Sequence, residues 1–196
     1  VNKLGQRFYD EGEDIWPKRY AIWGRLVAKQ PDQVAYAIID QKSVGLFMPT
    51  VYSAIKADTL ADLAAQLGVD AAEMEKTIAD YNAAVQPGEF NPTEPDGCTT
   101  KGLEPAKTNW ARKIDTPPYY GYPVKMGITF TYLGVEVNKR AQVIMKDDKP
   151  ATNIWAAGEI MAGNILGQGY AGGTGMAIGT VFGRIAGEEA ARHARN

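Results

Sequence analysis

The chain has 196 residues, of which 45% are hydrophobic and 22% charged, and its net charge at neutral pH is -2. This composition is typical of a globular protein, and its near-neutral balance gives no reason to expect nucleic acid or an anionic membrane as a partner. The apolar runs are far shorter than the ~20 residues that span a bilayer, and the N-terminus lacks the features of a signal peptide.

The cysteine and histidine content narrows the chemistry. Cys98 is the only cysteine and His193 the only histidine. An internal disulfide and a cysteine-only metal site are excluded, and His193, in a charged tail, is a poor candidate for catalysis or metal binding. We therefore predict no metal site and a reducing, cytoplasmic location. Because the chain begins at Val1 in a phrase typical of mid-protein sequence, we expect it to be the C-terminal part of a longer protein.

The first third of the chain combines helix and strand signals. Apolar residues at helical spacing predict a helix over residues 14–29, with Pro17 in its first turn. Residues 33–40 form a short apolar run that favours a strand. An α+β fold is therefore expected.

Two helices with well-marked ends follow. Thr59 can cap a helix over residues 60–67, and Gly68 supplies its stop. Asp70 and Glu73 form a capping-box pattern at the start of a second, longer helix. We predict that this helix pair is a packed scaffold.

The second half of the chain changes character. Residues 86–115 are rich in Pro, Gly, Thr and Asn and lack periodicity, so we predict a long ordered loop. Short strands broken by glycines and turns are then predicted over residues 119–126, 128–132, 135–138, 142–145 and 153–157. A long helix over about 173–192 closes the chain.

The most informative stretch joins the last predicted strand to this helix. Gly158 and Glu159 follow the strand, and a glycine-rich loop leads to Gly173. Backbone N–H groups and the helix dipole favour an anionic group at such a helix start, and glycines let the main chain approach a flat ring closely. Spacing alone leaves phosphate, carboxylate or flavin as ligands, with a glycine-rich helix packed on a sheet as the alternative. The stretch is neither a P-loop nor the dinucleotide fingerprint.

Three phrases carry a family resemblance: Ala156-Ala157-Gly158-Glu159, Gly172-Gly173, and residues 182–187. They closely resemble the C-terminal flavin-binding signature of the fumarate reductase/succinate dehydrogenase flavoproteins. The resemblance implies an FAD-dependent oxidoreductase. It also implies that residues 117–196 are the C-terminal segment of an FAD-binding Rossmann-like domain, built as strand, Gly-rich loop and helix.

The resemblance assigns roles along this stretch. It implies that Glu159, after Gly158, contacts the ribityl chain of FAD. Gly173, Thr174 and Gly175 would lie against the isoalloxazine ring, where the helix dipole stabilises the negative charge of reduced flavin.

The N-terminus resembles the same family. Residues 2–11 are similar to the phrase at the entry to its capping domain, which we expect over residues 1–116. By this resemblance, Glu11 joins a proton relay beside the substrate, with Arg7 as its companion. A structural Arg7–Glu11 ion pair on a turn is the alternative.

Within the family, residues 96–103, 107–111 and 127–134 resemble tricarballylate dehydrogenase and the flavoprotein half of one class of precorrin-3B synthase. This implies oxidation of a C–C bond of a small polycarboxylate, of the tricarballylate-to-aconitate type, with an iron–sulfur or haem protein as a possible electron-transfer partner. The chain by itself is expected to bind FAD weakly or not at all and to be inactive. The precorrin-3B synthase flavoprotein and a non-catalytic, cofactor-free binding module are the alternatives.

Three positions depart from the fumarate reductases. Phe130 replaces a substrate-binding histidine, Val44 a proton-donating arginine, and Tyr170 a substrate-clamping arginine, so fumarate reduction by that mechanism is not expected. Tyr170 instead resembles the tyrosine of 3-ketosteroid dehydrogenases, which predicts a catalytic contact with a substrate oxygen; packing is the alternative.

Substrate-binding candidates complete the prediction. Thr129 and Thr131 can supply hydroxyl groups to the same pocket. A polycarboxylate also needs a cation, for which Lys107, Arg112 and Lys125 are candidates, each of them equally a solvated charge.

Overall fold

The computed structural model describes residues 1–195, which form two compact units. The N-terminal unit is Val1–Met126, and the C-terminal unit begins at Gly127. Both mix helices with small sheets, in agreement with the predicted α+β class. The division lies later than the one predicted after residue 116, because β3 (Tyr119–Lys125) pairs with strands of the N-terminal unit.

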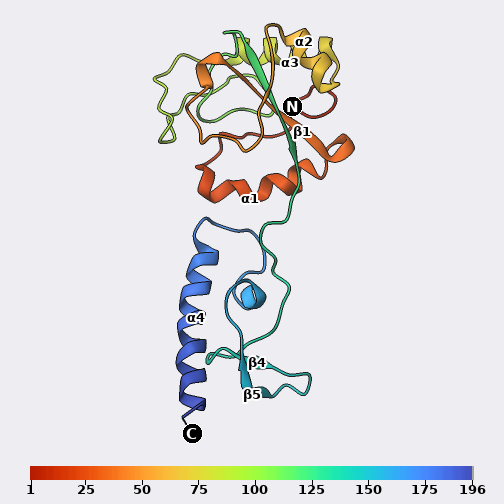
Figure 1. The fold of residues 1–196 in the computed structure, drawn as a ribbon. Helices are drawn as coiled ribbons and strands as arrows, with labels where there is room; N and C mark the ends of the chain where they lie inside the picture. The colour runs from red at the N-terminus through yellow and green to blue at the C-terminus, as the bar shows by residue number, and fades with distance from the viewer. Residues whose placement is uncertain (196) are drawn as a thin grey trace. The chain divides into compact units, whose positions relative to one another are not determined.

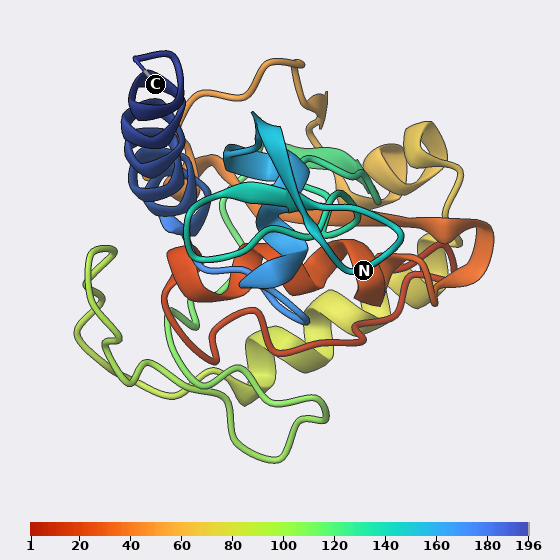
Figure 2. The same cartoon turned by 90° about the horizontal axis from the view of Figure 1, so that it is seen from below.

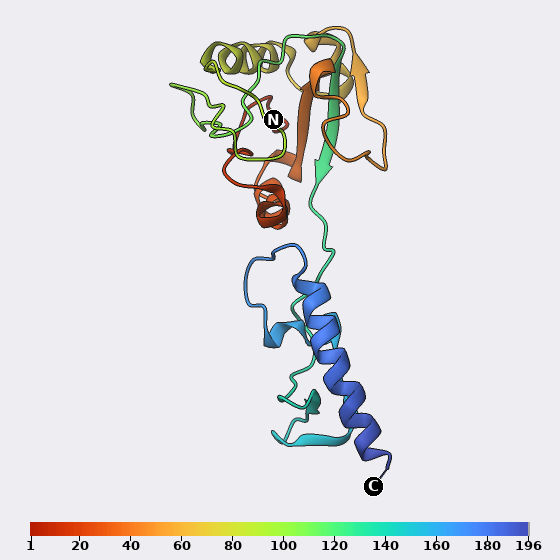
Figure 3. The ribbon, with the colours of Figure 1, turned by 90° about the vertical axis from the view of Figure 1, so that its left-hand side faces the viewer.

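The sheet of the N-terminal unit has three antiparallel strands. β3 lies between β1 (Val34–Asp40) and β2 (Ile55–Ala57), as Figure 3 shows. Single-turn 3-10 helices precede and follow β1, at Pro31–Gln33 and Gln41–Ser43. The two longer strands match the predictions for residues 33–40 and 119–126.

Three α-helices accompany this sheet: α1 (Trp16–Val27), α2 (Leu60–Leu67) and α3 (Ala71–Ala84). The predicted caps are confirmed. The Thr59 hydroxyl accepts the N–H of Asp62 at 3.0 Å, and Gly68 ends α2 with a left-handed φ of 64°. At the start of α3, the Asp70 carboxylate accepts the N–H of Glu73 at 2.8 Å.

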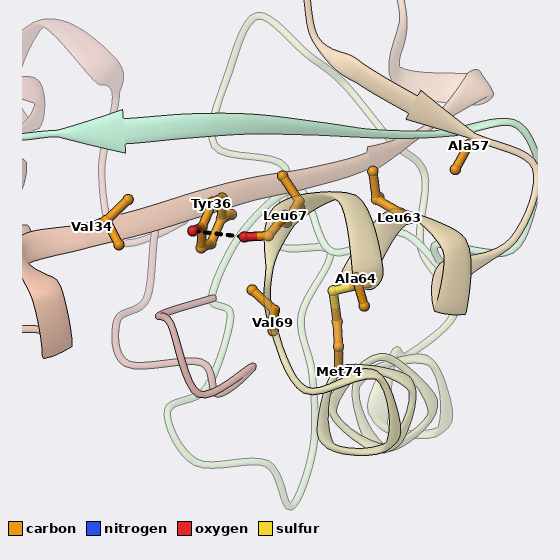
Figure 4. Packing of buried hydrophobic residues seen from close by; sticks show 8 residues of the cluster. All are labelled: Val34, Tyr36, Ala57, Leu63, Ala64, Leu67, Val69 and Met74. Atoms are coloured by element: carbon orange, nitrogen blue, oxygen red, sulfur yellow. Dashed lines mark hydrogen bonds between the residues drawn. The ribbon is translucent and has the colours of Figure 1, made fainter.

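The core of the N-terminal unit lies where β1 meets α2 and α3 (Figure 4). Leu63, Ala64 and Met74 are completely buried. Tyr36 reaches in from β1, and its hydroxyl donates a hydrogen bond to the carbonyl of Leu67 at 3.1 Å. This bond satisfies both the buried phenol and a carbonyl at the end of α2.

Asp40, at the end of β1, is only 1% exposed. One of its oxygens accepts the N–H groups of Asp115 and Thr116, both at 3.0 Å. The other accepts the N–H of Lys42 at 3.2 Å, and the Lys42 ammonium lies 3.3 Å from the carboxylate. Asp40 therefore joins the end of β1 to the segment that leads into β3.

The predicted long loop over residues 86–115 is ordered around Asp96 (yellow-green to green in Figure 2). The Asp96 carboxylate accepts N–H groups from Asn91, Cys98 and Trp110. Burial tends to raise the pKa of Asp96, but these N–H groups outweigh it and hold the pKa below its ordinary value. The Cys98 side chain is buried, with 3% exposure, and packs against the backbone of Gly88.

The C-terminal unit is built around α4 (Thr174–His193). This helix packs against the 3-10 segment η3 (Gly158–Asn164) and against β5 (Pro150–Trp155), which pairs with β4 (Gln142–Ile144) (Figure 1). Met161, Ala162 and Ile178 form its core. None of the helices among residues 1–195 has the length and hydrophobicity needed to cross a membrane.

The predicted strands over residues 128–132 and 135–138 are wrong as strands. The Val135 N–H bonds to the carbonyl of Ile160 at 2.8 Å, and the Thr131 N–H bonds to the Glu159 side chain at 2.7 Å. The backbone of this segment therefore binds η3, and its strand-like pairing is limited to a bridge between Val137 and Val143.

Candidate functional site

The start of α4 is an open, amide-lined helix end. Gly173 precedes the helix with a φ of 92°, a conformation that strongly favours glycine. Because Gly173 has no side chain, it does not cap the helix N-terminus. A side chain at Gly173 would meet nothing within 4 Å, and the first turn contains no acidic residue. The Met176 N–H has no acceptor within the described part of the chain. This helix end can therefore receive an electron-rich group.

Glu159 lies at the start of η3 and is held in place by Thr131. The Thr131 N–H and hydroxyl donate to the same Glu159 oxygen, at 2.7 and 3.1 Å. Gly158, just before it, has a φ of 82°. The second carboxylate oxygen has no hydrogen-bond partner among residues 1–195, and Glu159 is exposed. The contact thus orients a carboxylate that can still accept hydrogen bonds from a ligand.

Tyr170 contacts the same helix start. Its hydroxyl accepts the N–H of Gly175 at 3.0 Å, and its ring lies against Phe130, with centroids 5.1 Å apart. A Cβ at Gly175 would meet the Tyr170 hydroxyl at 2.7 Å and the Phe130 ring at 2.8 Å. The Tyr132 hydroxyl donates to the carbonyl of Gly169 and so ties down the loop before the helix.

The structure brings most of the predicted C-terminal residues together. Those in this cluster are Gly158, Glu159, Gly173, Thr174, Gly175, Thr131 and Tyr170. Thr129 is exposed, and no contact ties it to the cluster within the described residues.

A second cluster of predicted residues lies in the N-terminal unit. Glu11 is flanked by Lys107 at 3.2 Å and Arg7 at 3.7 Å. The side chains of these two cations are only 11% and 12% exposed, whereas Glu11 is 48% exposed. The Arg7 guanidinium also donates to the carbonyl of Pro105 and lies 5.3 Å from the centre of the Tyr81 ring. The predicted Arg7–Glu11 pair therefore exists, and Lys107 extends it.

These charges set the ionisation of the cluster. Partial desolvation within this cluster tends to raise the pKa of Glu11, but Lys107 and Arg7 outweigh it and hold the pKa below the ordinary value of 4.5. Burial also raises the pKa of the Tyr81 phenol to about 12, so Tyr81 stays neutral at physiological pH.

The lowered pKa of Glu11 predicts a pH-dependent contribution to stability. Its ion pairs contribute fully above pH 4.5, and the contribution is lost as the pH falls through the lower folded-state pKa. Glu11→Gln should therefore lower the free energy of unfolding more at neutral pH than in acid. Urea titrations at both pH values measure the difference. The exposed Glu75→Gln serves as the control, and an equal effect of Glu11→Gln at both pH values would contradict the expectation.

The Arg7–Glu11–Lys107 cluster lies on the wall of a cavity of about 480 Å³ in the N-terminal unit. Most side chains that line it are aliphatic or aromatic, and Arg112 is its remaining charged side chain. Pockets of this size hold small molecules, with a few polar groups fixing their orientation. Across the part of the chain that the structure describes, no group of His, Cys, Asp and Glu could hold a metal ion.

Comparison with known proteins identifies the family. The family described as "FAD binding domain" matches residues 1–176. The chain belongs to the FAD binding domain family. It is 34% identical to the probable fumarate reductase Ifc3 of Shewanella frigidimarina, over 99% of this chain and 31% of that protein. It is 30% identical to the urocanate reductase of Eggerthella lenta, over 97% of this chain and 30% of that protein.

Solved structures give the same result. The open conformation of a flavocytochrome c3 fumarate reductase matches with a TM-score of 0.70 and 30% identity, over 100% of this chain and 32% of that one. A 3-ketosteroid delta1-dehydrogenase from Sterolibacterium denitrificans shares the fold, with a TM-score of 0.66 and 24% identity. The chain thus spans about a third of the length of these relatives, and the curated relatives are oxidoreductases.

FAD, which the family implies, fits the cluster at the start of α4. Gly173 leaves open space at the start of the helix, and the nearby Met176 N–H has no acceptor among the described residues. Both features suit the carbonyl edge of a flat ring. Glu159, with one oxygen held by Thr131, suits a hydroxylated chain. These residues would hold the ring end of the cofactor.

Two features were missed at the sequence level. Lys107, a substrate-binding candidate, forms an ion pair with Glu11. Arg112 lines the cavity and stacks on Phe90, at 4.4 Å from the centre of the ring. No local signal reveals either pairing, because the partners lie far apart in the sequence.

Proposed function

We propose that this chain forms part of an FAD-dependent dehydrogenase that oxidises a C–C single bond next to a carboxylate. As its substrate we propose a small polycarboxylate, as in the conversion of tricarballylate to an aconitate. The observation that carries the proposal is the oriented Glu159 beside the open start of α4. The substrate class is supported by the names of relatives, which include fumarate, acrylate and urocanate, compounds whose C=C bond is conjugated with a carboxylate.

Two positions in the C-terminal unit argue against the mechanism of the fumarate reductases. Phe130 and Tyr170 occupy positions where fumarate reductases have a histidine and an arginine, and here they pack on each other. Neither can form an ion pair with a dicarboxylate, so the cation must come from elsewhere in the protein.

Each residue of the two clusters then has a role. Glu159, held by Thr131, would orient the hydroxylated chain of the cofactor, and the Met176 N–H at the start of α4, which has no acceptor among residues 1–195, would bind its electron-rich edge. The Tyr170 hydroxyl, which accepts the Gly175 N–H, becomes a stronger hydrogen-bond donor to a substrate oxygen. Glu11, beside Arg7, accepts and passes on a proton. Bound FAD would supply the two-electron acceptor that no side chain of the protein can provide.

The ring end of the cofactor is only part of FAD. We propose that residues 1–196 by themselves bind FAD weakly or not at all and have no activity, because the adenine and pyrophosphate end requires a further βαβ unit. Titration of the purified chain with FAD tests this proposal. A stoichiometric yellow complex from this chain alone would contradict it.

Loss of the Thr131 hydroxyl should weaken FAD binding. Thr131→Val removes one of the two bonds that orient Glu159, so the dissociation constant for FAD is expected to rise about tenfold, given ~1.5 kcal/mol for a hydrogen bond to a charged group. The measurement is flavin release from the complete gene product that contains residues 1–196. Thr180→Val, at an exposed position on α4, should leave the affinity unchanged.

The reaction is tested by anaerobic titration of the flavin-loaded complete gene product with tricarballylate, succinate and a 3-ketosteroid. Bleaching of the flavin absorbance by tricarballylate is the expected result. Bleaching by the steroid alone would favour the ketosteroid reaction that Tyr170 suggests. Reduction only through an iron–sulfur or haem protein would favour the precorrin-3B synthase flavoprotein. No response with bound flavin would contradict the proposed substrate class.

A further inference from the structure

The charged groups around the cavity of the N-terminal unit do not balance. Among the side chains that line it, three are cations (Arg7, Lys107 and Arg112) and only Glu11 is an anion. Glu11 pairs with Arg7 and Lys107, and the Arg7 guanidinium is further engaged by the carbonyl of Pro105. Because one carboxylate cannot neutralise three cations, the cavity keeps an excess of positive charge.

Arg112 is the cation without an ionic partner. Among residues 1–195, no carboxylate forms an ion pair with it, and its contact is the face of the Phe90 ring. The backbone next to it is held in place, since the preceding Ala111 N–H donates to the carbonyl of Cys98 at 2.9 Å. A stacked guanidinium on a fixed backbone is preorganised for a carboxylate, which it can bind through two parallel N–H groups.

The remainder of the cavity wall is apolar. Trp23, Phe47, Ile78 and Trp110 are among its aliphatic and aromatic side chains. Contact with such surface favours a ligand with an apolar body by about 25 cal/mol for each Å² removed from water. A tricarboxylate, charged along its whole length, gains nothing from this surface.

We propose that this cavity binds a small carboxylate with an apolar chain or ring, and that Arg112 recognises the carboxylate. The apolar body of the ligand lies against the tryptophan and phenylalanine side chains of the wall. This site belongs to the N-terminal unit alone and requires neither bound flavin nor turnover. Its occupation can therefore be measured separately from the proposed redox reaction, in which Glu11 of the same wall takes part.

Binding can be measured on the 196-residue chain without flavin. Because Trp23 and Trp110 line the cavity, tryptophan fluorescence reports its occupation. The probe is 3-cyclohexylpropionate, which does not absorb in this range, and its neutral amide is the matched ligand control. We expect saturable binding of the acid, with the amide at least tenfold weaker.

Substitutions then assign the carboxylate site. Arg112→Gln should weaken binding of the acid about tenfold and leave the affinity for the amide unchanged. Lys113→Gln changes the adjacent, exposed cation, which does not line the cavity, and should alter the affinity less than about twofold. Circular dichroism checks the folding of both variants, and the comparison of acid with amide on the unsubstituted chain stands even if Arg112→Gln does not fold.

Four results would overturn the proposal: no saturable binding of the acid, equal affinity for acid and amide, undiminished binding to a folded Arg112→Gln variant, or equally tight binding of tricarballylate. None of them would affect the flavin titration, which tests the proposed reaction separately.

Discussion

Gly134→Ala is expected to destabilise the C-terminal unit by about 3 kcal/mol or more. A Cβ at Gly134 would lie 1.7 Å from the carbonyl oxygen of Ile160, which is a backbone atom. This oxygen cannot move aside easily, because the next residue, Val135, donates its N–H to the same carbonyl at 2.8 Å. The change should therefore separate residues 131–135 from η3 and release Glu159. Urea unfolding followed by circular dichroism measures the loss.

Gly179→Ala is the matched control in the same unit. Gly179 lies within α4, and a Cβ there would meet nothing within 4 Å. Alanine should stabilise the helix by roughly 0.5–1 kcal/mol, because it restricts the unfolded chain and has the higher helix propensity. Similar stabilities for the two variants would contradict the close approach at Gly134.

Asp40→Ala is expected to cost the N-terminal unit about 3 kcal/mol. The 1% exposed carboxylate accepts backbone N–H groups from Asp115 and Thr116, which would be left without an acceptor. The substitution also removes a partner of Lys42. Thermal and urea unfolding of the chain measure the effect.

A surface ion pair provides the comparison for Asp40. Asp80 and Lys76 lie 3.3 Å apart on α3, with side-chain exposures of 56% and 67%. Asp80→Ala should change the stability by less than about 0.5 kcal/mol. An equally small loss of stability for Asp40→Ala would contradict the conclusion that Asp40 connects β1 to residues 115–116.

The elements that the sequence predicted well are those specified by neighbouring residues. The caps of α2 and α3 involve residues that lie three positions apart, so Thr59 and Asp70 can be recognised as caps from the sequence. The segment 128–138 was misjudged for the opposite reason. An extended apolar run looks the same whether its N–H groups bond to another strand or, as for Val135, to the carbonyl of Ile160.

The candidate sites show the same difference between features set by neighbouring residues and features set by distant ones. The residues around the start of α4 come largely from one continuous stretch, so glycine spacing and family resemblance could propose Glu159 and Gly173 as candidates. The cavity of the N-terminal unit brings together residues almost a hundred positions apart, as in the contact of Glu11 with Lys107. Such pairings depend on how the long loop folds back, and no local pattern encodes that.

The buried position of Cys98 makes the motion of the long loop measurable. Burial raises the pKa of this thiol, and the Asp96 carboxylate raises it further, so the folded loop protects the sulfur both sterically and chemically. Since the chain contains no other thiol, the rate at which a maleimide labels it reports how often residues 86–115 detach. A ligand that enters the neighbouring cavity and contacts Trp110 should slow this labelling. The labelling rate would then report whether the cavity is occupied, with no need for a chromophore on the ligand.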